Sequence, residues 1–297
     1  MRPAQLTLCV LLLAATGCVS PGGTHSYSVR EQGDARIGHY RSSEWSFETG
    51  SFWIEGPEGL VFIDTQFIPS ALNKQWTFAE VHTGKKPRLA VVLEPTPDRF
   101  NGTAWLTERD VPVVTSEQVR ALIPAVHARW APLFVEKYQP SGYPSDLVLP
   151  ASFGRRTTEL HAGGLTLKAH VLGVGSSPAH VVVEWEGHLF TGDLVTNGAH
   201  GWFEGGRVDA WLERLDELRA LKPRWIHPGH GPTGGPELLD READYLRAIQ
   251  AAVAVERPQG VSTPEALERI TGRVEERFPD YTHELNLRAL LRAEWAR

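Results

Sequence analysis

The chain has 297 residues, of which 41% are hydrophobic and 22% are charged, as in ordinary soluble globular proteins. This balance excludes an intrinsically disordered chain, and no set of apolar stretches is long enough for a multi-span membrane protein. Lysine and arginine number 30 against 36 aspartate and glutamate, without a basic arm or stripe, so we expect no nucleic-acid partner.

The first residues have the pattern of a targeting segment. Arg2 precedes an apolar run over 6–15 that is followed by small residues, which is typical of a secretory signal peptide over 1–17. Residues 15–18 resemble the lipobox of bacterial lipoproteins, whose cysteine is acylated and becomes the new N-terminus. We therefore expect an exported lipoprotein held on a membrane by lipidated Cys18 and facing the periplasm or the cell exterior. A plain signal peptide cut near the same point is the alternative.

The rest of the chain predicts a tether followed by one domain. Both cysteines, Cys9 and Cys18, lie in the first twenty residues, so the body has no disulfide and no thiolate metal site. Residues 18–36 hold proline, glycine and serine and few apolar side chains, which is typical of a tether. We expect a single domain over 37–297 that ends in helices.

In chain order, the body alternates short apolar runs with helical patterns. Strands are predicted over 51–54 and 60–63, which a turn separates, and over 89–93, 111–114, 166–172, 181–185 and 188–190. Helices are predicted around 71–82, 102–108, 208–221, 237–255, 263–277 and 283–295. Strand pairs mixed with helices in two similar halves predict an α/β sandwich.

Several familiar catalytic motifs are missing from the sequence. It has no Gly-x-Ser-x-Gly, no Walker loop, no His-Glu-x-x-His and no Gly-x-Gly-x-x-Gly. A serine hydrolase, a nucleotide-binding fold and a zincin therefore have no support.

Polar segments follow the predicted strands in a characteristic order. They are Ile63-Asp64-Thr65, the segment after Leu93, residues 173–178, Phe190-Thr191-Gly192-Asp193 and residues 228–231. As a set, from about Gly50 to Val255, they resemble the metallo-β-lactamase superfamily. The resemblance implies a sandwich of two mixed β-sheets with helices on both outer faces, and an active site in the loops at one edge.

The metal-binding residues that the resemblance implies are only partly present. The family carries His-x-His-x-Asp-His, a lone His, an Asp and a last His, which together hold two zinc ions. The corresponding residues here are Glu94-x-Thr96-x-Asp98-Arg99, then Ser176, Asp193 and His230. The first zinc site would retain only Glu94, because neutral hydroxyls are poor zinc ligands. We therefore do not expect two zinc ions.

The second zinc site retains three of its four ligands. Asp98, Asp193 and His230 are present, and three protein ligands plus water can form a catalytic zinc site. Arg99 replaces the fourth ligand, and it has no lone pair to donate and stays positively charged. It could instead pair with the two aspartates, which would otherwise be buried without a partner. The sequence thus predicts either no metal or one zinc ion.

Other residues are expected near the cleft. Pro95 and Pro97 favour extended conformations before them, so Glu94, Thr96 and Asp98 would share one face.

Some of these assignments have alternatives. Trp202 and Phe203 come after Asp193 on a glycine-rich loop, where they could contact an apolar substrate or cover the sheet edge. Asp98 could instead cap a helix that begins near residue 101. His180 or His227 could replace a lost ligand, although a lone histidine more often only forms hydrogen bonds.

Three functions remain open from the sequence. The first is a protein that no longer acts as a dizinc hydrolase and binds a small molecule or a protein partner in the cleft. The second is a hydrolase of esters, thioesters or amides, lactams included, with one metal on Asp98, Asp193 and His230. The third is metal-free hydrolysis with Asp193 or His230 as the base and Arg99 stabilising an oxyanion.

Overall fold

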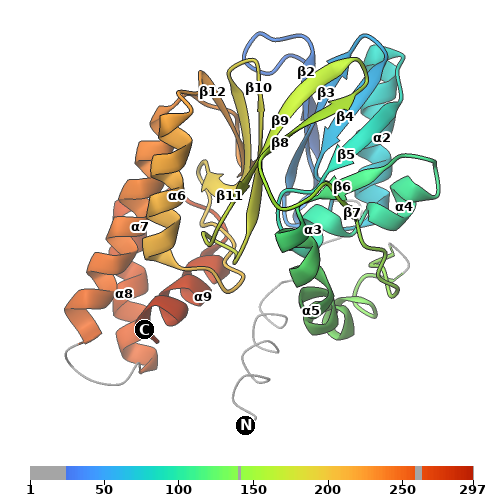
Figure 1. The fold of residues 1–297 in the computed structure, drawn as a ribbon. Coiled ribbons are helices and arrows are strands. Elements are labelled where there is room, and N and C mark those ends of the chain that lie inside the picture. The colour runs from blue at the N-terminus through green and yellow to red at the C-terminus, as the bar shows by residue number, and fades with distance from the viewer. Residues whose placement is uncertain (1–24, 140–141, 258–262, 297) are drawn as a thin grey trace.

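Two β-sheets pack face to face and helices cover both outer sides (Figure 1). The computed structural model describes residues 25–139, 142–257 and 263–296. The predicted signal peptide and Cys18 lie outside these residues. Among the described residues, no helix has the length and apolar character needed to cross a membrane. The sandwich predicted from the resemblance is confirmed.

The first sheet has seven strands that lie side by side in chain order. The first four pair antiparallel, and the pairs from β4 to β7 are parallel. Its strands are β1 (Ser26–Ser28), β2 (Ile37–Arg41), β3 (Gly50–Gly56), β4 (Gly59–Ile63), β5 (Pro87–Val91), β6 (Val113–Thr115) and β7 (Ala151–Ser152). Part of the segment expected as a tether therefore forms an edge strand, because β1 pairs with β2.

The second sheet has five strands in the order β12-β11-β10-β9-β8. Only β11 and β12 pair in parallel, and the other pairs are antiparallel. The strands are β8 (Thr158–Ala162), β9 (Leu165–Leu172), β10 (His180–Trp185), β11 (His188–Thr196) and β12 (Trp225–His230).

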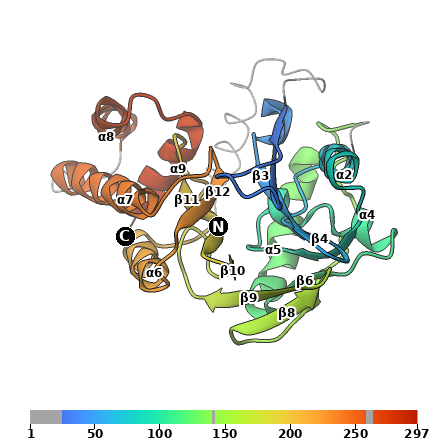
Figure 2. The same cartoon turned by 90° about the horizontal axis from the view of Figure 1, so that it is seen from above.

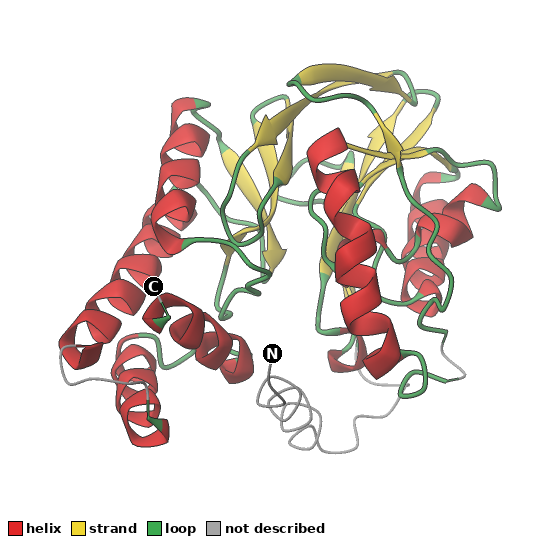
Figure 3. Ribbon diagram, turned by 60° about the horizontal axis from the view of Figure 1, so that its bottom comes forward, coloured by secondary structure: helices red, strands yellow, loops and turns green. Residues whose placement is uncertain are grey.

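The helices form the two outer layers (Figures 2 and 3). α2 (Pro69–Thr83) and α4 (Thr103–Thr107) lie beside the first sheet, whereas α3 (Pro97–Phe100) and α5 (Glu117–Phe134) lie at the lower end of the sheets in Figure 1. Outside the second sheet lie α6 (Val208–Ala220), α7 (Glu237–Glu256), α8 (Pro264–Arg277) and α9 (Glu284–Trp295). A short 3-10 helix, η1 (Glu44–Ser46), precedes β3.

Helix α5 is not predicted from the sequence. It contains Pro124 and Pro132, and proline ordinarily argues against a helix interior. The helix nevertheless begins with a clear cap, because the Ser116 hydroxyl accepts a hydrogen bond from the amide of Val119. Its apolar face packs onto the first core and offsets the proline cost.

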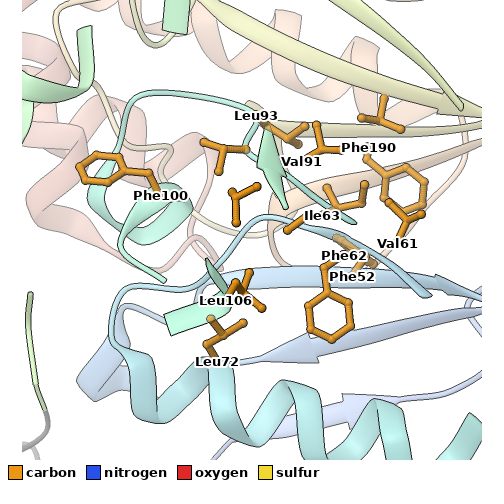
Figure 4. Packing of buried hydrophobic residues seen from close by; sticks show 14 of the residues in the cluster. Phe52, Val61, Phe62, Ile63, Leu72, Val91, Leu93, Phe100, Leu106 and Phe190 are labelled. Carbon is orange, nitrogen blue, oxygen red and sulfur yellow. The ribbon is translucent and has the colours of Figure 1, made fainter. Parts of the chain in front are cut away.

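Apolar side chains fill the space between the sheets and the layer beneath the C-terminal helices. Figure 4 shows the first core, where β3, β4, β5 and β11 contribute side chains that meet between the sheets. Phe52 and Phe190 pack edge to face across this space, with ring centroids 5.3 Å apart. A second cluster around Trp211 and Tyr245 joins β11 to α6 and α7. Burying each such side chain contributes about 1.5–3 kcal/mol.

The fold brings four polar strand ends to one edge. Asp64 follows β4, the segment 94–99 follows β5, Asp193 lies in β11, and His230 ends β12. The carboxyl ends of parallel neighbours meet at the same edge of a sheet, so these residues converge. This edge carries the candidate site.

Candidate functional site

Arg99 lies at the centre of the converging strand ends and is completely buried. Its guanidinium forms an ion pair with Asp193, and its Nε is 3.4 Å from Oδ2 of Asp98. Nη1 is 3.3 Å from Oδ2 of Asp64, and Nε is 3.6 Å from Oε1 of Glu94. One guanidinium therefore contacts four buried carboxylates. The pairing with Asp98 and Asp193 that the sequence predicts is present.

Two glycines allow this close packing. A Cβ on Gly229 would lie 2.4 Å from Nη2 of Arg99 and 2.4 Å from Oδ1 of Asp193. A Cβ on Gly192 would lie 2.5 Å from Oε1 of Glu94, and Gly192 also has φ +54°. Both positions therefore require glycine, because a side chain would separate the guanidinium from its carboxylates.

Gly192→Ala should destabilise the protein by about 3 kcal/mol, the sum of left-handed backbone strain and overpacking. Gly198→Ala is the matched control, because Gly198 has φ +79° and a Cβ there would meet nothing within 4 Å. Only the strain of about 1 kcal/mol is expected at this second position. Urea unfolding of both variants measures the difference, and equal losses would show that the contact with Glu94 does not matter.

An irregularity in β11 presents Asp193. Gly192 pairs with Pro228 and Thr196 pairs with His230, so four steps along β11 match two along β12. Such a bulge bends a strand and redirects a side chain, and bulges are common beside functional sites. The amide of Asp193 also donates a hydrogen bond of 2.6 Å to Oε1 of Glu94.

Asp98, Asp193 and His230 come together as the sequence predicts. Their potential ligand atoms all lie within 4.8 Å of one another, and no other such group of three occurs among residues 25–139, 142–257 and 263–296. His230 Nε2 is 3.5 Å from Asp193 Oδ1 and 3.9 Å from Asp98 Oδ2. Oδ2 of Asp193 is buried without a hydrogen-bond partner.

Burial and Arg99 act in opposite directions on these groups. Burial raises the pKa of Asp193 to about 6 and that of Asp64 to about 7, although Arg99 pulls both down. Burial also raises the pKa of Glu94 well above its usual value. Asp98 differs, because Arg99 and the hydrogen bond from the Thr49 hydroxyl oppose its burial, and its pKa lies below the usual value. One cation therefore cannot stabilise all four charges equally.

His230 is held as a neutral imidazole. Burial and the nearby positive charge of Arg99 together lower its pKa to about 4. His283 lies beside it with ring centroids 5.7 Å apart, and burial likewise lowers the pKa of His283 to about 4.

The residues present do not fit the pair of zinc ions that the resemblance implies. Thr96 and Ser176 are completely buried, and their hydroxyls have no hydrogen-bond partner. Neutral hydroxyls do not replace imidazoles as zinc ligands. At the second position, Arg99 already contacts Asp98 and Asp193, so a metal ion there would meet a neighbouring positive charge.

A cavity of about 450 Å³, open mouth included, lies over this network. Of the site residues predicted from the sequence, three line this cavity: Asp98, His230 and Trp202. Its full lining is Phe47, Phe67, Pro97, Asp98, Trp130, Phe134, Trp202, His230, His283 and Asn286.

The other residues expected in the cleft do not line this cavity. Glu94, Thr96 and Ser176 are fully buried behind it, where Glu94 bonds to the Asp193 amide. Phe203 packs against the second core cluster, because the loop turns its side chain toward the C-terminal helices.

Asp98 does not cap a helix. The N-cap of α3 is Thr96 and no side chain caps it, while Asp98 lies in the first turn. Asp98 instead accepts a hydrogen bond of 3.1 Å from the hydroxyl of Thr49. The sequence left open a helix-capping role for Asp98, and the structure does not give it that role.

Neither additional histidine joins the three-residue cluster. His180 Nδ1 is 3.6 Å from Oε2 of Glu94, and burial lowers the pKa of His180 to about 3. His227 is buried and lies 2.9 Å from both His188 and Thr233 through its two ring nitrogens. Both are hydrogen-bonding core residues.

Much of the cavity wall is not predicted from the sequence. Trp130 and Phe134 come from α5, which is not predicted, and their spacing of four residues is the available signal. His283 and Asn286 come from the start of α9, far along the chain. Phe47 follows η1 in a left-handed conformation with φ 62°.

Comparisons with known proteins agree with this architecture. The metallo-beta-lactamase superfamily profile matches residues 97–230. The type 2 metallo-beta-lactamase of Bacteroides fragilis is 34% identical over 85 residues, which are 26% of this chain and 34% of that protein. The chain therefore matches about a third of the length of this curated relative.

Solved structures share the fold at low sequence identity. A metallo-beta-lactamase from Pontibacter korlensis superposes with a TM-score of 0.60 at 21% identity, covering 75% of this chain and 99% of that one. The metallo-beta-lactamase FIM-1 of Pseudomonas aeruginosa, in its mono-zinc form, gives 0.59 at 16% identity, covering 76% and 97%. With its two mixed sheets and outer helices, this chain has the metallo-β-lactamase fold, and the profile of that superfamily matches its residues 97–230.

Proposed function

We propose that this protein binds a small molecule in the cavity beside Asp98 and does not act as a dizinc hydrolase. The observation that carries the proposal is the contact of Arg99 with Asp98 and Asp193. At the second metal position, the guanidinium supplies positive charge. Without such charge, the two buried carboxylates would be costly to the stability of the fold.

The first metal position supports the same proposal. Its three family ligands correspond to Glu94, Thr96 and Ser176, and all three are completely buried. Glu94 directs Oε1 toward the Asp193 amide and lies 3.6 Å from the Arg99 Nε. These ion pairs and hydrogen bonds support the proposal that the first zinc ion is not held here.

A second function is supported by the cluster of Asp98, Asp193 and His230. Three donors within 4.8 Å of one another, with Asp193 Oδ2 free of hydrogen bonds, could hold one metal ion. When bound, such an ion would supply Lewis acidity and an activated water for ester, thioester or amide hydrolysis. Arg99 weighs against it, because loading would place two cations beside the same carboxylates.

Metal-free hydrolysis has less support. Arg99 does not line the cavity, and its guanidinium is engaged with carboxylates and with the Gly50 carbonyl at 2.9 Å. Because the guanidinium does not reach the cavity, it is not placed to stabilise an oxyanion that forms there.

The N-terminal sequence adds a proposal on location. We propose export and membrane anchoring through lipidated Cys18, which membrane fractionation of Cys18→Ala against the unaltered chain would test.

Metal content per chain tests the proposed function. The full chain, purified without a metal-binding tag and dialysed against trace zinc, should contain essentially no zinc by elemental mass spectrometry. Asp193→Ala should give the same value. About one ion per chain that is lost in Asp193→Ala would establish the mononuclear site instead. Two ions would contradict the assignment of the ligand positions.

A further inference from the structure

Five aromatic rings form most of the cavity wall. Phe47, Phe67 and Phe134 pack edge to face, with centroids 4.8 Å apart between the first two and 5.3 Å between the last two. Trp130 stacks on Phe134 at 5.5 Å and lies 5.4 Å from Trp202. These rings come from four separate segments, so the wall is a tertiary feature of the fold.

A buried carboxylate fixes the two indoles. Glu204 is 4% exposed, and its Oε2 accepts hydrogen bonds from Nε1 of Trp130 at 3.0 Å and of Trp202 at 3.3 Å. Its other oxygen pairs with Arg129. Because both indole N–H groups are engaged there, the two rings are held by their polar edges beside the cavity.

Asp98 is the only carboxylate among the described lining residues, and no lysine or arginine lines the cavity with it. The two histidines in the lining are His230, which is buried, and His283, which is partly buried. The lining therefore combines one carboxylate with aromatic rings.

The charge beneath Asp98 is not balanced by Arg99 alone. The guanidinium lies within 3.6 Å of Asp64, Glu94 and Asp98 and also pairs with Asp193. Four carboxylates thus share one cation. Positive charge brought to Asp98 from the cavity would interact favourably with this group.

We propose that the cavity binds an organic cation, a quaternary or substituted ammonium group, against Asp98 and the rings of Trp130, Trp202 and Phe47. This rests on the proposed function and names its ligand class. An ammonium group is attracted by aromatic faces and by a carboxylate, and it needs no hydrogen-bond acceptor when fully alkylated. An anion would meet Asp98 without any lining cation, and a neutral apolar ligand would bury that carboxylate without compensation.

Three small molecules of nearly equal shape separate these possibilities. Choline is the cation, 3,3-dimethyl-1-butanol replaces its nitrogen with carbon, and 3,3-dimethylbutanoate carries the opposite charge. Calorimetric titration of the full chain should show choline binding at least about tenfold more tightly than the alcohol, with no binding of the anion.

Charge and ring variants place the binding in the cavity. Asp98→Asn should weaken choline binding by about tenfold or more and leave the alcohol nearly unchanged. Trp130→Leu should weaken choline binding several-fold. Asp244→Asn removes a carboxylate whose side chain is 58% exposed and pairs with Arg247, and it should leave binding unchanged.

Each outcome decides one question. If the alcohol or the anion binds as tightly as choline, the ligand class is wrong while a ligand-binding role stands. If choline does not bind at millimolar concentrations, or binds equally to Asp98→Asn, the proposal is overturned. Tightly bound zinc found by elemental analysis would overturn the proposed function, independently of the choline result.

Discussion

Arg99→Met is expected to lower the free energy of unfolding by about 3–5 kcal/mol at pH 7. Methionine fills a similar volume but leaves Asp64, Glu94, Asp98 and Asp193 without their common cation. Removing one partner of a buried ion pair leaves uncompensated charge in a medium of low polarity, which is far more costly than losing a surface pair.

Urea unfolding measures this loss, and Arg207→Met is the matched control. Arg207 pairs with Asp209 at 2.8 Å where both side chains are 54% exposed, so its replacement should leave the free energy of unfolding nearly unchanged. If Arg99→Met does not fold, Arg99→Lys keeps the charge but not the planar fork and should give an intermediate loss. Equal stabilities of the Arg99 and Arg207 variants would refute a central role for this ion-pair network.

Arg99→His is expected to create a tight zinc site. The exchange removes the competing positive charge and adds an imidazole beside Asp98, Asp193 and His230, which gives two histidines and two carboxylates. Four such ligands should hold zinc with a dissociation constant below about 1 μM, equivalent to about 8 kcal/mol. Zinc competition titration at pH 7 measures it against the unaltered chain.

The double variant Arg99→His with His230→Ala is the control for this gain. Loss of one of four ligands should weaken zinc binding by more than about tenfold. A single variant that binds no more zinc than the unaltered chain would show that the cluster is not shaped for a metal. Equal zinc binding by the double variant would place the ion elsewhere.

The centre of the site follows from sequence order, whereas its wall does not. Asp98, Arg99, Asp193 and His230 are predictable because the order of the polar segments that carry them resembles that of the metallo-β-lactamase superfamily. Parallel pairing then brings these segments to one edge.

The cavity wall depends on packing between distant segments. Helix α5 carries two prolines, so local propensity argues against the element that supplies Trp130 and Phe134. His283 reaches the cavity only because residues around Thr282 pair with those around Ala199. Such a contact depends on tertiary packing that no local pattern indicates. Phe203 shows the converse, since its glycine-rich loop does not fix which way the ring points.

The position of Arg99 between the two sheets has a consequence for cooperativity. Its guanidinium bonds to the Gly50 carbonyl at the start of β3 and pairs with Asp193 of β11, so it adds a polar link between two sheets that already share the apolar core around Phe52 and Phe190. Separating the two sheets would take buried carboxylates away from the cation that they share. The two halves should therefore exchange their most protected amide hydrogens in one concerted opening.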